Sequence, residues 1–318
     1  MSLNVSSSPH IRDQAKSSRI MLDVVIALIP ALIASVYIFG LRALLVICLT
    51  VGSAVLFEYL CRRVMKRENT ISDWSAVVTG LLLAFNLPPS IPLYIPVVGA
   101  FIAIVIVKQM FGGLGQNFVN PALTARIILT LSFPAVMTRW TLLSRHIGDL
   151  ASSDLVSTAT PLYLLRSGST AADLPSYLDL FLGLKGGCIG EVSVLALLIG
   201  AAYLMIRKVI SGWIPFVYIL TVFGFTALMG LDPVYHVLSG GLFIGAFFMA
   251  TDYVTSPLTV RGKIIFAVGC GLLTSVIRVF GGMTEGVSFS IIFMNILTPH
   301  IDRWTIPVSF GGARHAES

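Results

Sequence analysis

The most restrictive feature of this sequence is a succession of apolar runs that are long enough to cross a lipid bilayer. A transmembrane helix needs about 20 mainly apolar residues. We expect ten spans, of which the third, fifth and tenth are short and bounded by Pro or Gly, at residues 21–39, 42–60, 73–87, 92–111, 120–137, 190–207, 213–230, 234–250, 263–280 and 287–302. Because only 11% of the residues are charged and 56% are hydrophobic, the chain cannot cover a water-facing surface. The sequence therefore predicts an all-α polytopic membrane protein.

The basic residues indicate how these spans are oriented. If the N-terminus is cytoplasmic, the cytoplasmic segments contain 14 Lys and Arg residues and the outer segments contain 6. Four of those six lie in the long outer segment 138–189, where the positive-inside rule has the least weight. The distribution predicts that both termini are cytoplasmic and that residues 138–189 lie outside.

Two short matches suggest that the chain contains an internal repeat. Gly80–Phe85 resembles Gly241–Phe247, and Phe111-Gly-Gly113 resembles Phe280-Gly-Gly282. Each half would have five spans, and an odd number requires the second half to enter from the opposite side, as in the inverted repeats of transporters. The expected organisation is a cytoplasmic segment 1–20, a first five-helix repeat 21–137, an extracytoplasmic segment 138–189, a second five-helix repeat 190–302 and a cytoplasmic tail 303–318.

Helix-breaking residues interrupt the two halves at corresponding places. Asn86-Leu-Pro-Pro-Ser90 ends the third span, and Thr251–Pro257 follows the eighth. Free backbone groups at such breaks can bind ions when they line a protein cavity, and the alternative is a pair of ordinary interfacial turns. Asp23 and Glu58 lie near the cytoplasmic ends of the first two spans, where the sequence favours an interfacial position.

Arg126 lies inside the predicted span 120–137, about one and a half turns from its start. An unpaired arginine at the bilayer centre costs about 2.5–3.5 kcal/mol on insertion scales. Two interpretations remain open: Arg126 contacts a cofactor or ion, or it is paired for structural reasons. We include it among the candidate cofactor-binding residues.

The longest polar interval contains Asp154-Leu-Val-Ser-Thr-Ala-Thr-Pro161. It offers one carboxylate and three hydroxyl groups, and Pro161 favours an extended or turn conformation at Thr160. Considered locally, such a cluster is typical of a solvated loop or a helix cap.

Several other classes of site are not supported by the sequence. The four cysteines are scattered without a CxxC pair, and no histidine has a metal-ligand spacing, so no metal site is predicted. There is no phosphate-binding GxxxxGK[ST] motif and no catalytic constellation. The net charge of +6 comes from residues at the ends of apolar runs, which indicates membrane topology rather than nucleic-acid binding.

Three separated motifs resemble a known family. They are Phe111-Gly-Gly-Leu-Gly-Gln-Asn-Phe-Val-Asn-Pro-Ala-Leu123, the run Asp154–Pro161, and the segment from Gly240-Gly241 to Ala250-Thr-Asp252. They resemble the D subunits of the Rnf electron-transport complex, which are related to the B subunits of the sodium-pumping NADH:quinone reductase. The resemblance extends over essentially the whole chain.

The resemblance implies a covalent flavin. In this family FMN is attached through its phosphate to a threonine of the motif Asp-x-x-Ser/Thr-Gly-Ala-Thr, which places the acceptor at Thr160. Asp154, Ser157 and Ala159 match the motif, and Thr158 replaces its glycine, so the turn is less permissive there. These residues form the candidate cofactor-binding set, together with Arg126.

The resemblance also implies a function and partners. Such a subunit carries electrons through FMN in an ion-translocating ferredoxin:NAD+ oxidoreductase of a bacterial or archaeal cytoplasmic membrane, and it is not catalytic alone. Its partners are the other Rnf subunits, including a second covalent-flavin subunit, and a flavin transferase that acts outside the membrane. A non-covalent riboflavin and the choice between Na+ and H+ stay open. The alternatives are a cofactor-free inverted-repeat transporter or channel, and a scaffold subunit without flavin.

Overall fold

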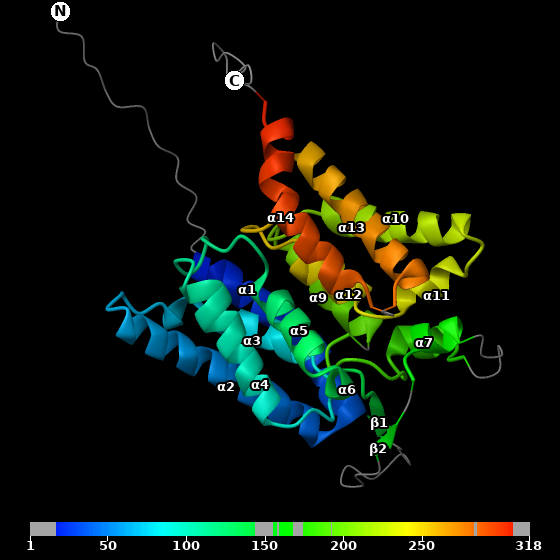
Figure 1. The fold of residues 1–318 in the computed structure, drawn as a ribbon, viewed down its shortest axis with the longest axis horizontal. Helices are drawn as coiled ribbons and strands as arrows, with labels where there is room; N and C mark the ends of the chain where they lie inside the picture. The colour runs from blue at the N-terminus through cyan, green and yellow to red at the C-terminus, as the bar shows by residue number, and fades with distance from the viewer. Residues whose placement is uncertain are drawn as a thin grey trace, which may run out of the picture.

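The computed structural model describes residues 17–143, 155–157, 159–167, 174–191, 193–282 and 285–307. This part of the chain is helical except for one short two-stranded sheet (Figure 1). The first half contains α1 Ser17–Phe39, α2 Leu41–Val64, η1 Ile71–Asp73, α3 Ser75–Phe85, α4 Tyr94–Phe101, the π-helical segment η2 Ile102–Gln109, α5 Pro121–Ser132 and α6 Pro134–Met137. The connecting segment contains β1 Thr141–Leu143, β2 Leu155–Ser157, α7 Pro161–Arg166 and α8 Tyr177–Leu182. The second half contains α9 Val194–Ile206, α10 Trp213–Leu228, α11 Pro233–Leu238, α12 Leu242–Ile244, the π-helical segment η3 Gly245–Met249, α13 Val260–Phe280 and α14 Val287–Thr305.

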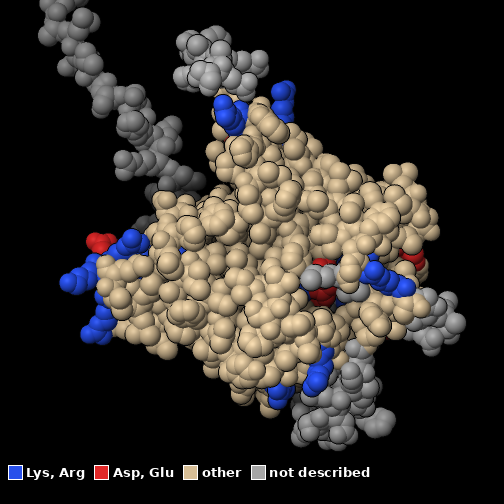
Figure 2. Space-filling view, in the orientation of Figure 1, with Lys and Arg blue, Asp and Glu red and all other residues tan. Residues whose placement is uncertain are grey.

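The helices have the character of membrane-embedded segments. Three of the described helices, α1, α2 and α13, are long and apolar enough to cross a bilayer, and five shorter apolar segments of 10–17 residues accompany them. Large apolar side chains on their outer surfaces are exposed, including Ile33, Leu220 and Leu228. Figure 2 shows a mostly uncharged surface, with charged side chains at a few places along its margins and in one region within the visible face. A polytopic membrane protein is therefore confirmed, whereas the count of ten spans stays a prediction.

Two of the spans that we expected to be short are half-length helices. α3 has 11 residues and α5 has 12, which corresponds to about 16–18 Å at 1.5 Å per residue, against a hydrocarbon core of about 30 Å. α3 ends just before Asn86 and the prolines that follow it. α5 begins at Pro121, and the side chain of Asn120 caps it by accepting from the backbone N–H groups of Ala122 and Leu123.

The broken ends from the two halves of the chain meet in the interior. Asn120 Nδ2 donates to the backbone oxygen of Met249 at 3.4 Å, and Asn86 Nδ2 lies 3.7 Å from Met249 Sδ. α1 packs on α9, and α5 packs on α14, so helices of the first half contact helices of the second. This arrangement agrees with the predicted repeat interface, although the inverted symmetry itself stays a prediction.

Gly200 allows the close contact between α1 and α9. A Cβ atom at this position would lie 1.9 Å from the backbone oxygen of Ala27 and 3.2 Å from the ring of Phe248. We expect Gly200→Ala to lower the free energy of unfolding by about 1–3 kcal/mol, because backbone must move to admit the methyl group. Gly224→Ala on α10 is the matched control, since no atom lies within 4 Å of the place that its methyl group would occupy. Equal unfolding curves for the two variants in detergent would contradict this account of the helix contact.

The segment predicted to lie outside contains more structure than the sequence indicated. β1 and β2 pair antiparallel, with Thr141 opposite Ser157. Its last part then enters the protein: Ile189 N donates to Leu87 O at 3.0 Å and Gly190 N donates to Phe85 O at 2.9 Å. A further hydrogen bond from Ser35 Oγ to Ile189 O anchors this strand-like run against α1. The stretch 185–191 is consequently a buried loop against the end of α3, which the sequence does not predict.

Candidate functional site

A cavity of about 480 Å³ lies beside the connecting segment and is the setting for the predicted site residues. Small-molecule sites commonly have volumes of about 300–1,000 Å³. The lining combines an arginine, a carboxylate, hydroxyls and three aromatic rings; it consists of Arg126, Ile127, Thr130, Pro134, Met137, Thr138, Trp140, Ala159, Thr160, Tyr163, Gly282, Glu285, Ser288 and Phe289. The cavity therefore brings together Arg126, Ala159 and Thr160, which the sequence proposed separately.

Thr160 caps the N-terminus of α7. Its backbone is extended, with φ −67° and ψ 149°, and Pro161 occupies the first helical position. Its Oγ1 accepts from Tyr163 N at 3.3 Å, which satisfies one of the free N–H groups of the first turn. The residue is 5% exposed and lies on the cavity wall. The local interpretation as a helix cap is thus confirmed, and the cap also places the hydroxyl at the cavity.

Arg126 is both paired and placed at the cavity. Its guanidinium donates to Asn86 Oδ1 at 2.5 Å and to Cys188 Sγ at 3.5 Å, and it forms an ion pair with Glu285. Asn86 is the residue that ends the broken helix α3, so the arginine connects that break with the cavity. The structural pairing of Arg126 is therefore confirmed. Because Arg126 also lines the cavity, a contact with a cofactor or ion stays a proposal.

The structure describes two of the four remaining predicted site residues, Ser157 and Ala159. Asp154 and Thr158 lie outside the described residues. Ser157 is in β2, and Ala159 is half-buried in the cavity lining. Sequence reasoning missed Glu285, which follows the Phe280-Gly-Gly282 motif and lies in the connection between two predicted spans.

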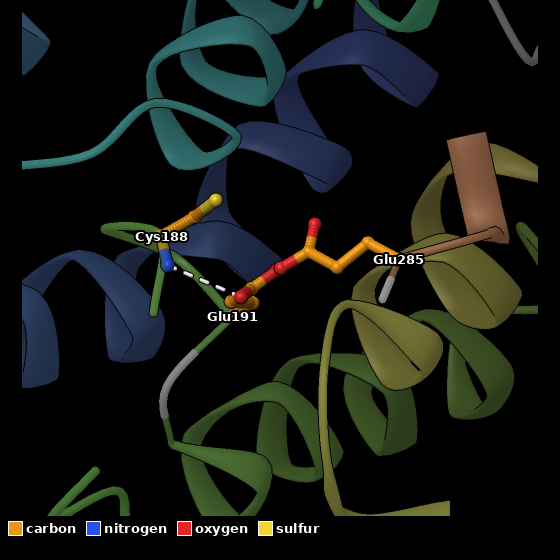
Figure 3. Close-up of side chains that lie close together, drawn as sticks. All are labelled: Cys188, Glu191 and Glu285. Carbon is orange, nitrogen blue, oxygen red and sulfur yellow. Dashed lines mark hydrogen bonds between the residues drawn. The ribbon is translucent and has the colours of Figure 1, made fainter. Parts of the chain in front are cut away.

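Glu285 belongs to a buried cluster with Cys188 and Glu191, in which one ligand atom from each lies within 4.8 Å of the others. Figure 3 shows the carboxyl groups of Glu191 and Glu285 pointing toward each other, with Cys188 beside Glu191. Cys188 N donates to Glu191 Oε1 at 3.1 Å. Burial and the charge of Glu191 raise the pKa of Glu285, in the loop before α14, to about 7. These residue types can bind metals, but Arg126 already bonds to both Glu285 and Cys188, which disfavours a cation there.

The cavity and the main basic clusters lie at opposite ends of the helices. Arg62 and Arg63 occupy the last turn of α2, and Arg303 occupies the last turn of α14. In Figure 1 these helix ends are remote from α7 and the β1–β2 pair, and Figure 2 shows blue side chains gathered at the same places. The connecting segment is thus at the end of the bundle that lacks these clusters.

Comparison with known proteins gives a consistent result. The sequence profile of the NQR2, RnfD, RnfE family matches residues 4–311. The chain is 53% identical over 307 residues to the D subunit of the Na+-translocating ferredoxin:NAD+ oxidoreductase complex of Acetobacterium woodii, with 96% of this chain and 94% of the relative covered. It is 46% identical over 324 residues to the D subunit of the proton-translocating ferredoxin:NAD+ oxidoreductase complex of Clostridium ljungdahlii, with 98% and 96% covered. The D subunit of an ion-translocating oxidoreductase complex from Stutzerimonas stutzeri is 40% identical over 324 residues, with 92% of each chain covered. This chain belongs to the NQR2, RnfD, RnfE family.

Proposed function

We propose that this chain is the D-type membrane subunit of an ion-translocating ferredoxin:NAD+ oxidoreductase and that it carries FMN bound through its phosphate to Thr160. The observation that carries the proposal is the position of Thr160 on the wall of the 480 Å³ cavity that Arg126 also lines. The relatives named as subunits of such complexes are similar to the chain along nearly its full length. The chain then acts within a complex and is not an enzyme alone.

The cavity has the chemistry that a flavin mononucleotide requires. Trp140, Tyr163 and Phe289 offer aromatic surface for a ring system. Arg126 offers a permanent positive charge for an anionic group. FMN, when attached, supplies the redox chemistry. The protein's contribution is then the Thr160 hydroxyl that holds the phosphate and the lining that limits contact with water.

Location and coupling form a second part of the proposal. Both termini lie in the cytoplasm and Thr160 lies on the outer side of the cytoplasmic membrane, supported by the basic clusters at the opposite helix ends. One electron moving through about 100 mV releases about 2.3 kcal/mol, which matches the cost of moving one charge against 100 mV. A modest potential drop can therefore drive one Na+ or H+. The partners are the other Rnf subunits, a second covalent-flavin subunit and a flavin transferase, and a non-covalent riboflavin is a further candidate cofactor.

A cofactor-free transporter is the rival function. The observation in its favour is the meeting of the broken ends of α3, η3 and α5 around Asn86, Met249 and Asn120. Interrupted helices that meet between repeats are typical of substrate sites in secondary transporters. The two functions are distinguished by whether the chain retains a flavin after denaturation, which is simple to measure.

Flavin retention after denaturation tests the proposed function. We expect the chain, produced together with a flavin transferase, to show a fluorescent flavin band on a denaturing gel. Thr160→Ala removes the acceptor oxygen and abolishes the band, whereas Thr160→Ser keeps a hydroxyl and retains a weaker band. Thr138→Ala is the control, because it removes a hydroxyl from the same cavity lining but lies outside the motif. A colourless wild-type protein from cells whose transferase labels another substrate would favour the transporter.

A further inference from the structure

Two carboxyl groups face each other inside the protein, one from the residues just before α9 and the other from the loop between α13 and α14. Glu191 is 3% exposed and ends the buried loop 185–191, and the side chain of Glu285, which precedes α14, is 18% exposed. Their facing carboxyl groups lie within 4.8 Å in at least one pair of oxygens (Figure 3). Gly241 permits this approach, since a Cβ atom there would lie 2.9 Å from Glu191 Oε2.

The pair is short of hydrogen-bond donors. Glu191 Oε1 accepts from Cys188 N, and Glu285 Oε2 accepts from Arg126. No described residue donates to Glu191 Oε2 or to Glu285 Oε1. Leaving a charged oxygen buried without a hydrogen-bond donor is unfavourable, because the oxygen loses its bonds to water. A hydrogen atom between the two free oxygens would satisfy both at once.

The described cations near the pair do not donate a hydrogen bond to its two free oxygens. The charged and titratable groups facing the pair come from three elements. They are Arg126 on α5, Cys188 and Lys185 in the buried loop 185–191, and Arg278 on α13. Lys185 Nζ donates to Leu238 O at 2.5 Å. Arg278 donates to the backbone oxygens of His236 and Ser239 at 2.6 and 3.1 Å. Among the described residues, Arg126 is therefore the one cation bonded to the pair, and two adjacent carboxylates have a single bonded positive charge.

We propose that Glu191 and Glu285 share one proton and so form a buried proton-binding site next to the Thr160 cavity. One carboxyl is neutral and donates its O–H to the other, which remains a carboxylate held by Arg126. Two like charges at this separation in a low-dielectric interior cannot both persist, so the first proton is retained when the second is lost. The site takes up one proton from water and releases it to water without any redox co-reactant.

The site has a consequence that rests on the proposed function. Glu285 lines the cavity, so negative charge added there when an attached flavin is reduced raises the affinity of the pair for its proton. The pair then gains protons as electrons arrive and loses them as electrons leave. The shared proton itself depends only on the geometry of the two carboxyl groups and does not require the flavin.

Infrared spectroscopy of the purified full-length chain tests the shared proton. We expect a C=O stretching band of a protonated carboxyl that shifts in D2O and is lost as the pH rises. Its midpoint lies above the ordinary range of a glutamic acid, because burial and the charge of Glu191 raise the pKa of Glu285. Glu191→Gln and Glu285→Gln each remove this band. Asp23→Asn is the matched control and leaves it unchanged, because Asp23 is a buried carboxylate already satisfied by Tyr203 and Arg207. The wild-type titration stands on its own if a variant fails to fold.

Four results would overturn the proposal or its extension. A wild-type protein with no protonated-carboxyl band across neutral pH, or a band that survives in both glutamine variants, excludes the shared proton. Loss of the band on addition of Na+ at constant pH assigns the site to a metal cation instead. The band persists in Thr160→Ala, which separates this site from flavin attachment. In the flavin-loaded protein, dithionite raises the midpoint; an unchanged midpoint excludes the redox-linked extension alone.

Discussion

Replacing Arg126 with glutamine is expected to lower the free energy of unfolding by about 3–5 kcal/mol, since removal of one partner leaves a buried charge without compensation. Arg126 connects Asn86, Cys188 and Glu285, so the substitution removes bonds to three segments at once. Its neutral replacement also leaves Glu191 and Glu285 without a bonded cation. Unfolding of the purified chain in detergent, followed by circular dichroism, measures the loss.

Two variants identify the cause of that loss. Arg126→Gln combined with Glu285→Gln removes the uncompensated charge, and we expect it to recover a substantial part of the stability. Arg207→Gln is the control, because its ion pair with Asp23 spans 3.3 Å and the arginine side chain is 52% exposed. An ion pair whose arginine is exposed contributes little, because solvent screens it. If Arg126→Gln destabilises the chain no more than Arg207→Gln does, the bonds of Arg126 are not a major source of stability.

Lys108→Met is the second substitution with a large expected effect. Lys108 Nζ lies 2.6 Å from Glu58 Oε2 and 2.6 Å from Ser75 Oγ, and the two charged side chains are only 2% and 1% exposed. Methionine preserves most of the side-chain volume but leaves the Glu58 carboxylate buried beside a thioether. We expect a loss of about 3–5 kcal/mol in the free energy of unfolding.

Replacing both partners separates charge from packing. Because buried ion pairs can often be exchanged for apolar side chains of similar volume at little cost, Lys108→Met with Glu58→Met should regain most of the stability. Lys66→Met, at an exposed position after α2, is the control and should change stability by less than about 0.5 kcal/mol. If the double variant is as unstable as Lys108→Met, the loss of stability does not come from the uncompensated charge of Glu58.

Much of the fold could be predicted from local sequence. The apolar runs located the helices, and prolines at 88, 89 and 121 indicated where α3 ends and where α5 begins. These signals act over a few residues, through backbone geometry and the absence of an N–H group. The same local chemistry indicated that Thr160 caps a helix or lies in a solvated loop. Its assignment as an attachment point came from the family resemblance and not from local chemistry.

The ion pairs could not be predicted, because they join residues that are distant in sequence. Arg126 and Glu285 are separated by 159 positions, and Lys108 and Glu58 by 50. Glu58, which we expected near the cytoplasmic interface, is fully buried against Lys108, and its depth in the membrane stays a prediction. The helix containing Lys108 is π-helical at that point, and its wider turn changes which side chains face inward. Neither the pairing nor the wider turn has a signature in residue spacing.

The measurement that tests the central claim most directly is peptide mass spectrometry of the chain produced with its flavin transferase. We predict that the peptide containing Thr160 carries the mass of an FMN phosphoester, that fragmentation places the added mass on Thr160, and that Thr160→Ala eliminates it. An unmodified Thr160 peptide from cells in which the transferase demonstrably works would contradict the account.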